Sequence, residues 1–153
     1  MISTDNVIEL HAQCLERHGG APGLRDAQCP DRSLDMAQSY CYYASLSDDE
    51  QVVEDGLLLA ASLCFYLCEN HCFVDGNKRI AWAAAMKVLE QTLDLTINAT
   101  DDEAEAFMLA IASRHEGSTV TIGKDEVVIE DAGDVVRWMS ERLVASPHIT
   151  RPH

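Results

Sequence analysis

The sequence predicts a single all-α domain, a helical bundle with a small β-hairpin near its C-terminus. Apolar residues recur at the spacing of an α-helix through most of the chain, and capping residues or glycines separate these periodic segments. The chain has 153 residues, of which 47% are hydrophobic. This is enough for one core but too little for two ordinary domains. We therefore expect one domain over residues 1–145 and a flexible tail over residues 146–153.

The first helix is expected to begin after Ser3 or Thr4, which are good N-cap residues, and to end at the glycine pair at residues 19–20. His11 and His18 lie on or beside its apolar stripe. A histidine on an apolar stripe is more often a packing residue with a hydrogen bond than a ligand. We therefore interpret both histidines as packing residues.

Two further helices are expected before the middle of the chain. One begins near Asp31 and ends at the tyrosines within residues 40–43. The other follows a capping box at residues 47–50, in which a serine and a glutamate satisfy each other's end of the helix. This long helix is apolar on nearly all faces, which predicts a central position in the bundle. It carries His71 to its C-terminal end.

The second half of the chain is expected to hold three helices and the hairpin. An alanine-rich apolar segment at residues 80–89 predicts a helix that packs antiparallel to the central one. A second capping box at residues 100–103 opens a helix to about His115. β-Branched residues around a glycine predict the hairpin within residues 118–129, and a last helix is expected over residues 131–144.

The charge of the chain excludes some classes of partner. The formal net charge is -15, from 26 acidic and 11 basic residues, which argues against a broad surface for nucleic acid or for an anionic membrane. No apolar run approaches the length that spans a bilayer, and the first residues lack the regions of a signal peptide. We therefore expect a cytoplasmic protein whose phosphate-binding sites, if any, are locally positive.

Three of the six cysteines, Cys64, Cys68 and Cys72, recur every four residues and so share one helix face. We interpret them as small buried hydrophobic residues rather than as a disulfide framework, because the chain is not a short secreted one. The alternative is a metal site that uses Cys68, His71 and Cys72. No second pair of ligands at a zinc-like spacing supports it.

The most informative segment is the run His-Cys-Phe-Val-Asp-Gly-Asn-Lys-Arg at residues 71–79, where one apolar helix ends and the next begins. A glycine and the free N–H groups of a helix start can receive an anion, and two cations can neutralise phosphate. A carboxylate can hold a divalent cation, and a histidine can accept a proton. The alternative is an ordinary capped helix start, with Asp75 as its N-cap and two surface cations.

This segment resembles the signature of the Fic/Doc family, and most closely its death-on-curing toxin branch, which reads His-x-Phe-x-Asp/Asn-Gly/Ala-Asn-Lys-Arg. The fixed positions are matched by His71, Phe73, Asp75, Gly76, Asn77, Lys78 and Arg79. Residues 15–20 and 23–26 also look like the N-terminal segment of such toxins, so the resemblance covers roughly residues 5–115 and implies a compact Fic/Doc-like bundle. The sequence departs from the pattern at Cys72, where proline is common, and at residues 30–32.

The resemblance implies a set of catalytic residues. His71 would be the general base for a protein hydroxyl, which agrees with a side chain that titrates near working pH. Asp75 would bind Mg²⁺, and this Mg²⁺ would bridge the phosphates of the nucleotide. Lys78 and Arg79 would contact those phosphates, one as a point charge and the other as a planar fork.

The resemblance also implies how the cofactors ATP and Mg²⁺ would be held. Gly76 and Asn77, at the first turn of the following helix, would form an anion cradle from backbone N–H groups and the Asn77 amide, beside Lys78 and Arg79. We interpret Phe73 as a structural plug that anchors the loop in the core.

Lys78 favours one reaction over another. Adenylylating members of the family resemble a pattern with glycine at this position, where it leaves room for the α-phosphate. A lysine there goes with the toxin branch, in which the γ-phosphate faces the hydroxyl and the enzyme acts as a Ser/Thr protein kinase. The resemblance implies a translation factor similar to elongation factor Tu as the substrate, and arrested translation as the outcome. The alternatives are an adenylyltransferase and a catalytically silent partner-binding module.

The resemblance further implies a cognate antitoxin of the Phd kind, part of which folds along a groove of the toxin. Other Fic proteins inhibit themselves with a helix that reads Ser/Thr-x-x-x-Glu-Gly/Asn. Here Glu116 and Gly117 are present, but Ala112 stands where the hydroxyl residue belongs. We therefore expect inhibition by a separate protein.

Overall fold

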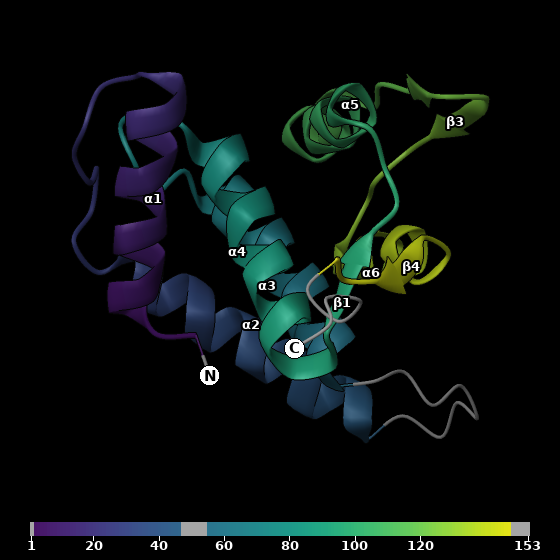
Figure 1. Cartoon of the computed structure of the whole chain (residues 1–153), viewed down its shortest axis with the longest axis horizontal. Coiled ribbons are helices and arrows are strands. Elements are labelled where there is room, and N and C mark those ends of the chain that lie inside the picture. The colour runs from purple at the N-terminus through teal and green to yellow at the C-terminus, as the bar shows by residue number, and fades with distance from the viewer. Residues whose placement is uncertain (1, 47–54, 148–153) are drawn as a thin grey trace.

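The computed structural model describes residues 2–46 and 55–147. The helices are α1 (Thr4–His18), α2 (Cys29–Ser45), α3 (Asp55–Asn70), α4 (Asn77–Leu93), α5 (Asp101–Ala112), the 3-10 turn η1 (Arg114–Glu116) and α6 (Ala132–Ser140). The strands are β1 (Leu95–Ile97), β2 (Val120–Ile122), β3 (Asp125–Val127) and β4 (Leu143–Ala145). This mostly helical fold with a small hairpin confirms the predicted class (Figure 1).

The helix α3 lies at the centre of the bundle. Nearly every side chain from Leu57 to Cys68 is buried, because α2, α4 and α6 all pack against this helix. The pair α3 and α4 is the expected antiparallel pair, and the buried alanines of α4 allow a close approach. Figure 1 shows α1 on one side of this pair and α5 and α6 on the other. The loop between α3 and α4 is therefore held at one end of the most buried part of the molecule.

The predicted ends of α1 are confirmed. Ser3 caps the helix in a capping box with Asn6, and Gly19 ends it with φ +77. His11 is 4% exposed, which confirms it as a packing residue. The interpretation of His18 is wrong, because this side chain is exposed. It lies in the last turn of α1.

The helix α2 differs from the prediction at both ends. It begins at Cys29 rather than near Asp31, since Pro30 suits a first turn where the missing N–H is not needed. It also continues past the tyrosines to Ser45. The capping box expected at residues 47–50 lies outside the described residues.

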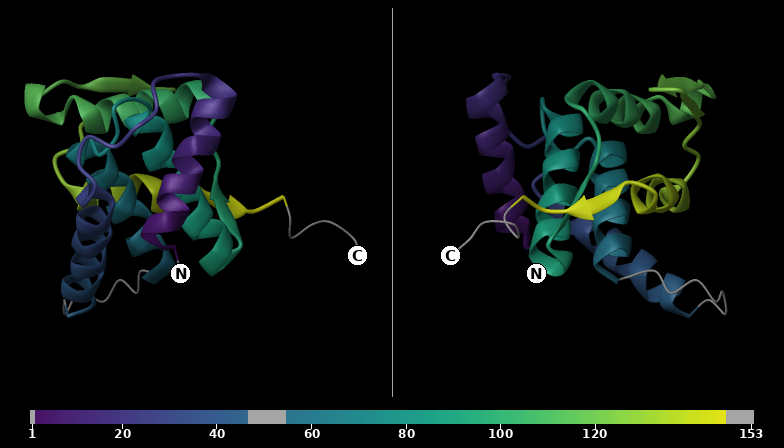
Figure 2. Two further views of the ribbon diagram at one scale, coloured as in Figure 1. Left: turned by 90° about the vertical axis from the view of Figure 1, so that its left-hand side faces the viewer. Right: turned by 45° about the vertical axis from the view of Figure 1, so that its right-hand side comes forward.

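The capping box of α5 and the hairpin are confirmed. Thr100 and Glu103 satisfy each other's backbone N–H groups at the start of α5. The helix α5 ends at Ala112, earlier than predicted. The 3-10 turn η1 follows it, and Gly117 is its C-cap. Strands β2 and β3 pair antiparallel within residues 118–129. Both views of Figure 2 show this hairpin beside α5, against which β2 packs.

The prediction of a last helix over residues 131–144 is wrong in its second half. The helix α6 ends at Ser140, and the following residues form β4, which pairs antiparallel with β1 so that Thr96 faces Val144. The apolar spacing alone cannot separate three residues of strand from a last helical turn. The pairing with a strand nearly 50 residues away decides the outcome. No helix in the described part of the chain is long and apolar enough to cross a bilayer.

Candidate active site

The candidate site begins where α3 ends. The helix stops at Asn70, and His71 adopts a left-handed backbone with φ +48. This conformation costs a non-glycine residue roughly 1 kcal/mol, so the neighbouring residues must hold it. The sequence suggested that His71 forms the C-terminal end of this helix, but the helix stops one residue earlier. The imidazole of His71 is exposed.

The segment between α1 and α2 holds the loop that follows His71. The N–H of Arg25 donates to the carbonyl oxygen of Cys72 at 2.8 Å, and the N–H of Val74 donates to the carbonyl oxygen of Gly23 at 3.0 Å. These two bonds make residues 23–25 a short strap across the loop. Residues 23–26, which resemble part of the N-terminal segment of Fic/Doc toxins, thus hold the loop beside the site in place.

Phe73 is the plug that the sequence predicted, and it is 1% exposed. Its ring stacks on the ring of His11 with a centroid distance of 3.7 Å. His11 also donates from Nε2 to the carbonyl oxygen of Asp75 at 2.8 Å. His11 therefore packs against the loop through Phe73 and holds the backbone of Asp75 through a hydrogen bond.

Asn77 closes the loop with its side chain. Its Nδ2 donates to the carbonyl oxygen of Phe73, and its Oδ1 accepts from the N–H of Phe73, both at 2.9 Å. The sequence suggested that this amide joins an anion cradle, but here it is committed to the loop. What remains for an anion is the row of backbone N–H groups in the first turn of α4.

The start of α4 has no side-chain cap. Gly76 occupies the N-cap position with φ +77, so the alternative of an ordinary helix start capped by Asp75 is wrong. The N–H groups of the first turn and the positive end of the helix dipole are thus free to meet a negative ligand. Glycine suits this position because it adopts a left-handed backbone at little steric cost. It also has no Cβ that would obstruct an approaching ligand.

The carboxylate of Asp75 lies between two backbone segments. Its Oδ1 accepts from the N–H of Gly76 at 2.8 Å, and its Oδ2 lies 3.3 Å from the N–H of Ala21. A Cβ at Gly20 would come within 2.8 Å of Oδ2, whereas one at Gly19 would meet nothing within 4 Å. Gly20 therefore makes room for the carboxylate. The sequence showed it only as a helix stop.

Asp75 suits a magnesium ion that a nucleotide shares. Mg²⁺ in such sites usually binds through one or two carboxylates together with phosphate oxygens and water. Within the described residues, no group of three or more His, Cys, Asp or Glu side chains could hold a metal by itself. The exposed Asp75 carboxylate therefore fits a Mg²⁺ ion whose other ligands would be phosphate oxygens and water.

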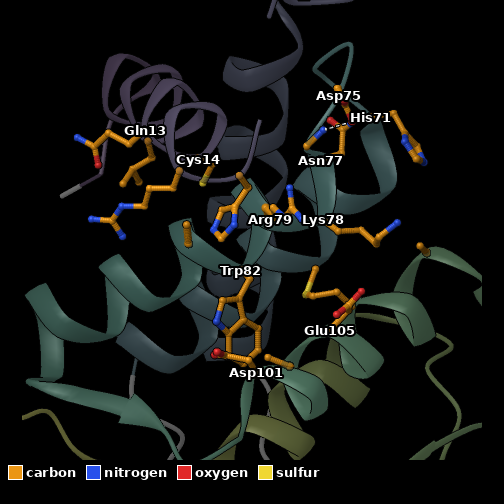
Figure 3. Close-up of a pocket in the computed structure, with 18 of the residues that line it drawn as sticks. Gln13, Cys14, His71, Asp75, Asn77, Lys78, Arg79, Trp82, Asp101 and Glu105 are labelled. Carbon is orange, nitrogen blue, oxygen red and sulfur yellow. Dashed lines mark hydrogen bonds between the residues drawn. The ribbon is translucent and has the colours of Figure 1, made fainter. Parts of the chain in front are cut away.

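All six predicted site residues line one cavity of about 790 Å³. They are His71, Asp75, Gly76, Asn77, Lys78 and Arg79. Figure 3 shows Asp75 and Asn77 at the loop, Lys78, Arg79 and Trp82 along α4, and Asp101 and Glu105 across from them on α5. α1 and α5 contribute further residues to the lining of this cavity.

The sequence did not predict several of the residues that line this cavity. Arg17 and His18 reach it from α1, and Trp82, Asp101 and Glu105 line its other side. Arg17 lies within residues 15–20, which resemble the N-terminal segment of Fic/Doc toxins. This resemblance could have indicated that Arg17 belongs to the site. The acidic residues of α5 carried no such signal, because their distance from the motif depends on how α5 packs against α4.

The cavity is lined by three cations, Arg17, Lys78 and Arg79, and by three acidic residues, Asp75, Asp101 and Glu105. Arg17, Lys78 and Arg79 form no ion pair with any of the described residues. Their charges are therefore not neutralised within this part of the chain. Against a net charge of -15, these unpaired cations of α1 and α4 provide the local attraction that an anionic ligand needs.

The cysteines behave in two different ways. Cys72 forms a disulfide with Cys29, so its interpretation as a free buried hydrophobe is wrong, and so is the alternative metal site with Cys68 and His71. The partner lies 43 residues away and has no periodic relation to Cys72. Cys64 and Cys68 are buried and free, as predicted. Burial raises the pKa of Cys68 to about 12, which makes it an inert packing residue.

Glu69 ties the end of α3 to η1. It accepts from Nε of Arg114 at 2.7 Å and lies 3.1 Å from Nε2 of His115. The same arginine donates to the carbonyl oxygen of Glu130 and lies over the ring of Phe65. This contact sets the position of the chain that follows α5 relative to the end of α3. The sequence did not indicate it.

Residues 1–89 match the Fic/DOC family. The match includes the whole motif loop and the helices that hold it. The chain belongs to this family. Over 119 residues it is 27% identical to the protein named "Protein kinase doc" of Escherichia phage P1, a match that covers 71% of this chain and 89% of that protein.

A second relative matches over a shorter stretch. The chain is 45% identical over 56 residues to the protein named "Toxin Doc" of Mycolicibacterium smegmatis. The match covers 36% of this chain and 43% of that protein. Both Fic/DOC relatives carry the name of the branch that the motif resembles.

Proposed function

We propose that this Fic/DOC protein is a Doc-like toxin and acts as an ATP-dependent protein kinase. It transfers a phosphate to a serine or threonine hydroxyl of a translation factor similar to elongation factor Tu, and thereby arrests translation. The observation that carries the proposal is the uncapped start of α4, which opens with Lys78 and Arg79 into the same cavity as His71. The names of the two relatives, a protein kinase and a toxin, support it.

The residues of the chain have distinct roles in this reaction. The backbone N–H groups at the start of α4 hold phosphate oxygens, and Lys78 and Arg79 neutralise their charge. Asp75 would hold a Mg²⁺ ion, which would supply charge neutralisation at the phosphates. His71 accepts the proton of the attacking hydroxyl. Phosphoryl transfer needs mainly this positioning and charge stabilisation.

Lys78 supports transfer of the γ-phosphate rather than of the nucleotide. Its side chain is exposed and lines the cavity next to Arg79. It occupies the place where a glycine would leave room for an α-phosphate. The aligned relative with the name of a protein kinase is consistent with this direction.

An antitoxin of the Phd kind is proposed as the inhibitor. The protein has a net charge of -15, so a basic antitoxin segment would be attracted to its surface. Ala112 lies in the last turn of α5, where a self-inhibitory helix would need a hydroxyl residue. Inhibition from a separate chain agrees with this feature.

Labelled ATP tests the reaction directly. The protein is incubated with Mg²⁺, with purified elongation factor Tu or a cell lysate, and with ATP labelled at either the α- or the γ-phosphate. Retention of the γ label alone supports the kinase. Retention of the α label alone would show an adenylyltransferase, and retention of neither would show a silent binding module. If γ label appears on lysate proteins but not on elongation factor Tu, the reaction stands and the substrate is wrong.

The variant His71→Ala tests the mechanism. The rate of transfer should fall by about 100-fold to 10,000-fold, the usual contribution of a general base, while ATP still binds. The matched control is His115→Ala, because His115 is also an exposed histidine but does not line the cavity. A His71→Ala variant that transfers label at the rate of this control would refute the role of His71.

A further inference from the structure

The disulfide between Cys29 and Cys72 lies next to the proposed general base. It joins the first residue of α2 to the residue that directly follows His71, with a Cα–Cα distance of 5.2 Å. Cys29 is 1% exposed and Cys72 is fully buried. A covalent bond thus fixes the backbone beside His71 to a helix that contributes no residue to the cavity.

The residue before His71 is tied to the same helix. Nδ2 of Asn70 donates to Oγ of Ser33 at 2.8 Å. That hydroxyl in turn donates to the carbonyl oxygen of Cys29 at 2.9 Å and lies 3.5 Å from Sγ of Cys72. Both neighbours of His71 are therefore held by the first turns of α2, one through hydrogen bonds and the other through the disulfide.

The position of the His71 imidazole depends on this backbone. The residue is left-handed at φ +48, and its exposed ring forms no hydrogen bond or ion pair with the described residues. The backbone of Asn70 and Cys72 therefore sets where the Cβ of His71 lies, and with it the region that the imidazole can reach.

The phosphate-binding part of the loop is anchored separately. Asn77 bonds to both backbone groups of Phe73, and His11 bonds to the carbonyl oxygen of Asp75. None of these contacts involves α2 or the disulfide. Loss of the disulfide should then disturb His71 more than the start of α4.

We propose that the Cys29–Cys72 disulfide is a positioning device for His71, and that its reduction slows phosphoryl transfer without releasing the nucleotide. This inference rests on the proposed function, because it takes His71 as the general base. It makes the activity of the protein depend on the thiol–disulfide balance around it. The cysteines do not touch the substrate in this proposal and act only through His71.

The chemical step needs a dithiol as reductant. A thiolate of the dithiol attacks one sulfur of the disulfide, which breaks the Cys29–Cys72 bond and forms a mixed disulfide. The second thiol of the reductant then releases the protein sulfur. Cys29 and Cys72 gain two electrons and two protons in total, and the dithiol leaves as a disulfide. Because both sulfurs are buried, the attack follows a local opening of the loop.

Steady-state kinetics test the proposal on the full-length protein. The oxidised form is compared with the form reduced by dithiothreitol, with the double variant Cys29→Ala/Cys72→Ala, and with Cys41→Ala as a control half-buried cysteine away from the loop. We expect kcat to fall about 10-fold on reduction and in the double variant, since a small misplacement of a catalytic group has large effects on rate. The KM for ATP and the stoichiometry of ATP binding should stay unchanged. Reoxidation should restore kcat, and the double variant should not respond to dithiothreitol.

Two results would overturn the proposal. One is equal kcat in the oxidised and reduced forms. The other is a loss of ATP-binding stoichiometry in parallel with kcat, which would show that the disulfide only keeps the molecule folded. Hydrogen exchange of the backbone amides provides a readout that does not need transfer. Faster exchange at residues 70–74 with unchanged exchange at residues 77–79 supports the proposal, and unchanged or uniformly faster exchange contradicts it. If the oxidised protein transfers no label to any acceptor, the proposed function fails, and this exchange measurement still decides whether the disulfide holds the loop.

Discussion

The helices α4 and α5 begin beside the same cavity, but their starts have opposite character. At α4, Gly76 provides no side-chain cap, and Lys78 and Arg79 follow in the first turn. At α5, Thr100 caps the helix, and three acidic residues follow it. A helix start can therefore serve as an anion site when the N–H groups of its first turn are free and the residues of that turn are not acidic.

The contacts at the start of α5 explain why it is closed to an anion. Oγ of Thr100 accepts from the N–H of Glu103 at 3.1 Å, and Oε1 of Glu103 accepts from the N–H of Thr100 at 3.0 Å. Asp101 adds a negative charge that faces the cavity. Under the proposed function, this difference in charge would orient a nucleotide between the two helices with its phosphates toward α4.

The largest expected effect comes from an acidic residue at the open start. Gly76→Asp should raise the Kd for ATP about 100-fold, since like charges about 5 Å apart repel by about 3 kcal/mol at an effective dielectric constant of about 20. The matched control is Gly76→Asn, which has the same size and tolerates the same left-handed backbone. Isothermal titration with ATP measures both variants. Equal losses would mean that shape, not charge, decides binding at this start.

A smaller effect is expected from the glycine that makes room for Asp75. Gly20→Ala should raise the Mg²⁺ concentration for half-maximal transfer about 10-fold, because the new Cβ displaces a carboxylate that must be placed within about 1 Å. Gly19→Ala is the control, since it also has a positive φ but meets no atom within 4 Å. Both variants should lose some stability through the strained backbone. An equal shift in the two variants would show that the loss of stability, and not the displaced carboxylate, causes the effect.

At the closed start, the expected effect is on stability alone. Thr100→Ala should lower the free energy of unfolding by about 1 kcal/mol, the usual loss of a helix cap, and leave the Kd for ATP unchanged. Urea denaturation measures the first quantity, and Thr100→Ser, which retains the hydroxyl, should stay close to the wild type. A weaker ATP affinity in Thr100→Ala would indicate that this helix start also contributes to binding.

The smallest expected effect is the pH dependence of the same cap. The hydrogen bond from the N–H of Thr100 lowers the pKa of Glu103 below its ordinary value of 4.5. Stabilisation by this carboxylate is therefore fully present above that value and is lost as the pH falls through the lowered pKa. Melting temperatures of the wild type and Glu103→Gln should differ most at neutral pH and converge in acid. Parallel curves over this range would contradict the coupling.

Local interactions made much of this protein predictable from its sequence. The caps at Ser3 and Thr100 and the glycine stop at Gly19 involve residues only a few positions apart, so their patterns are visible in the chain. The same holds for the motif at residues 71–79, where one short loop carries most of the proposed phosphate-binding chemistry. The resemblance of this motif to the Fic/Doc signature was sufficient to identify the family, and the match over residues 1–89 confirmed it.

The contacts between segments far apart in the chain could not be predicted from the sequence and depend on the tertiary structure. The disulfide of Cys72 with Cys29, the pairing of β1 with β4 and the ion pair of Glu69 with Arg114 connect segments that no periodic pattern relates. The exposure of His18 depends in the same way on how whole helices pack, and so does the position of Asp101 and Glu105 at the cavity. Hydrogen bonds between near neighbours follow from short-range geometry, whereas contacts across the bundle follow from the burial of the core, which the order of residues does not display.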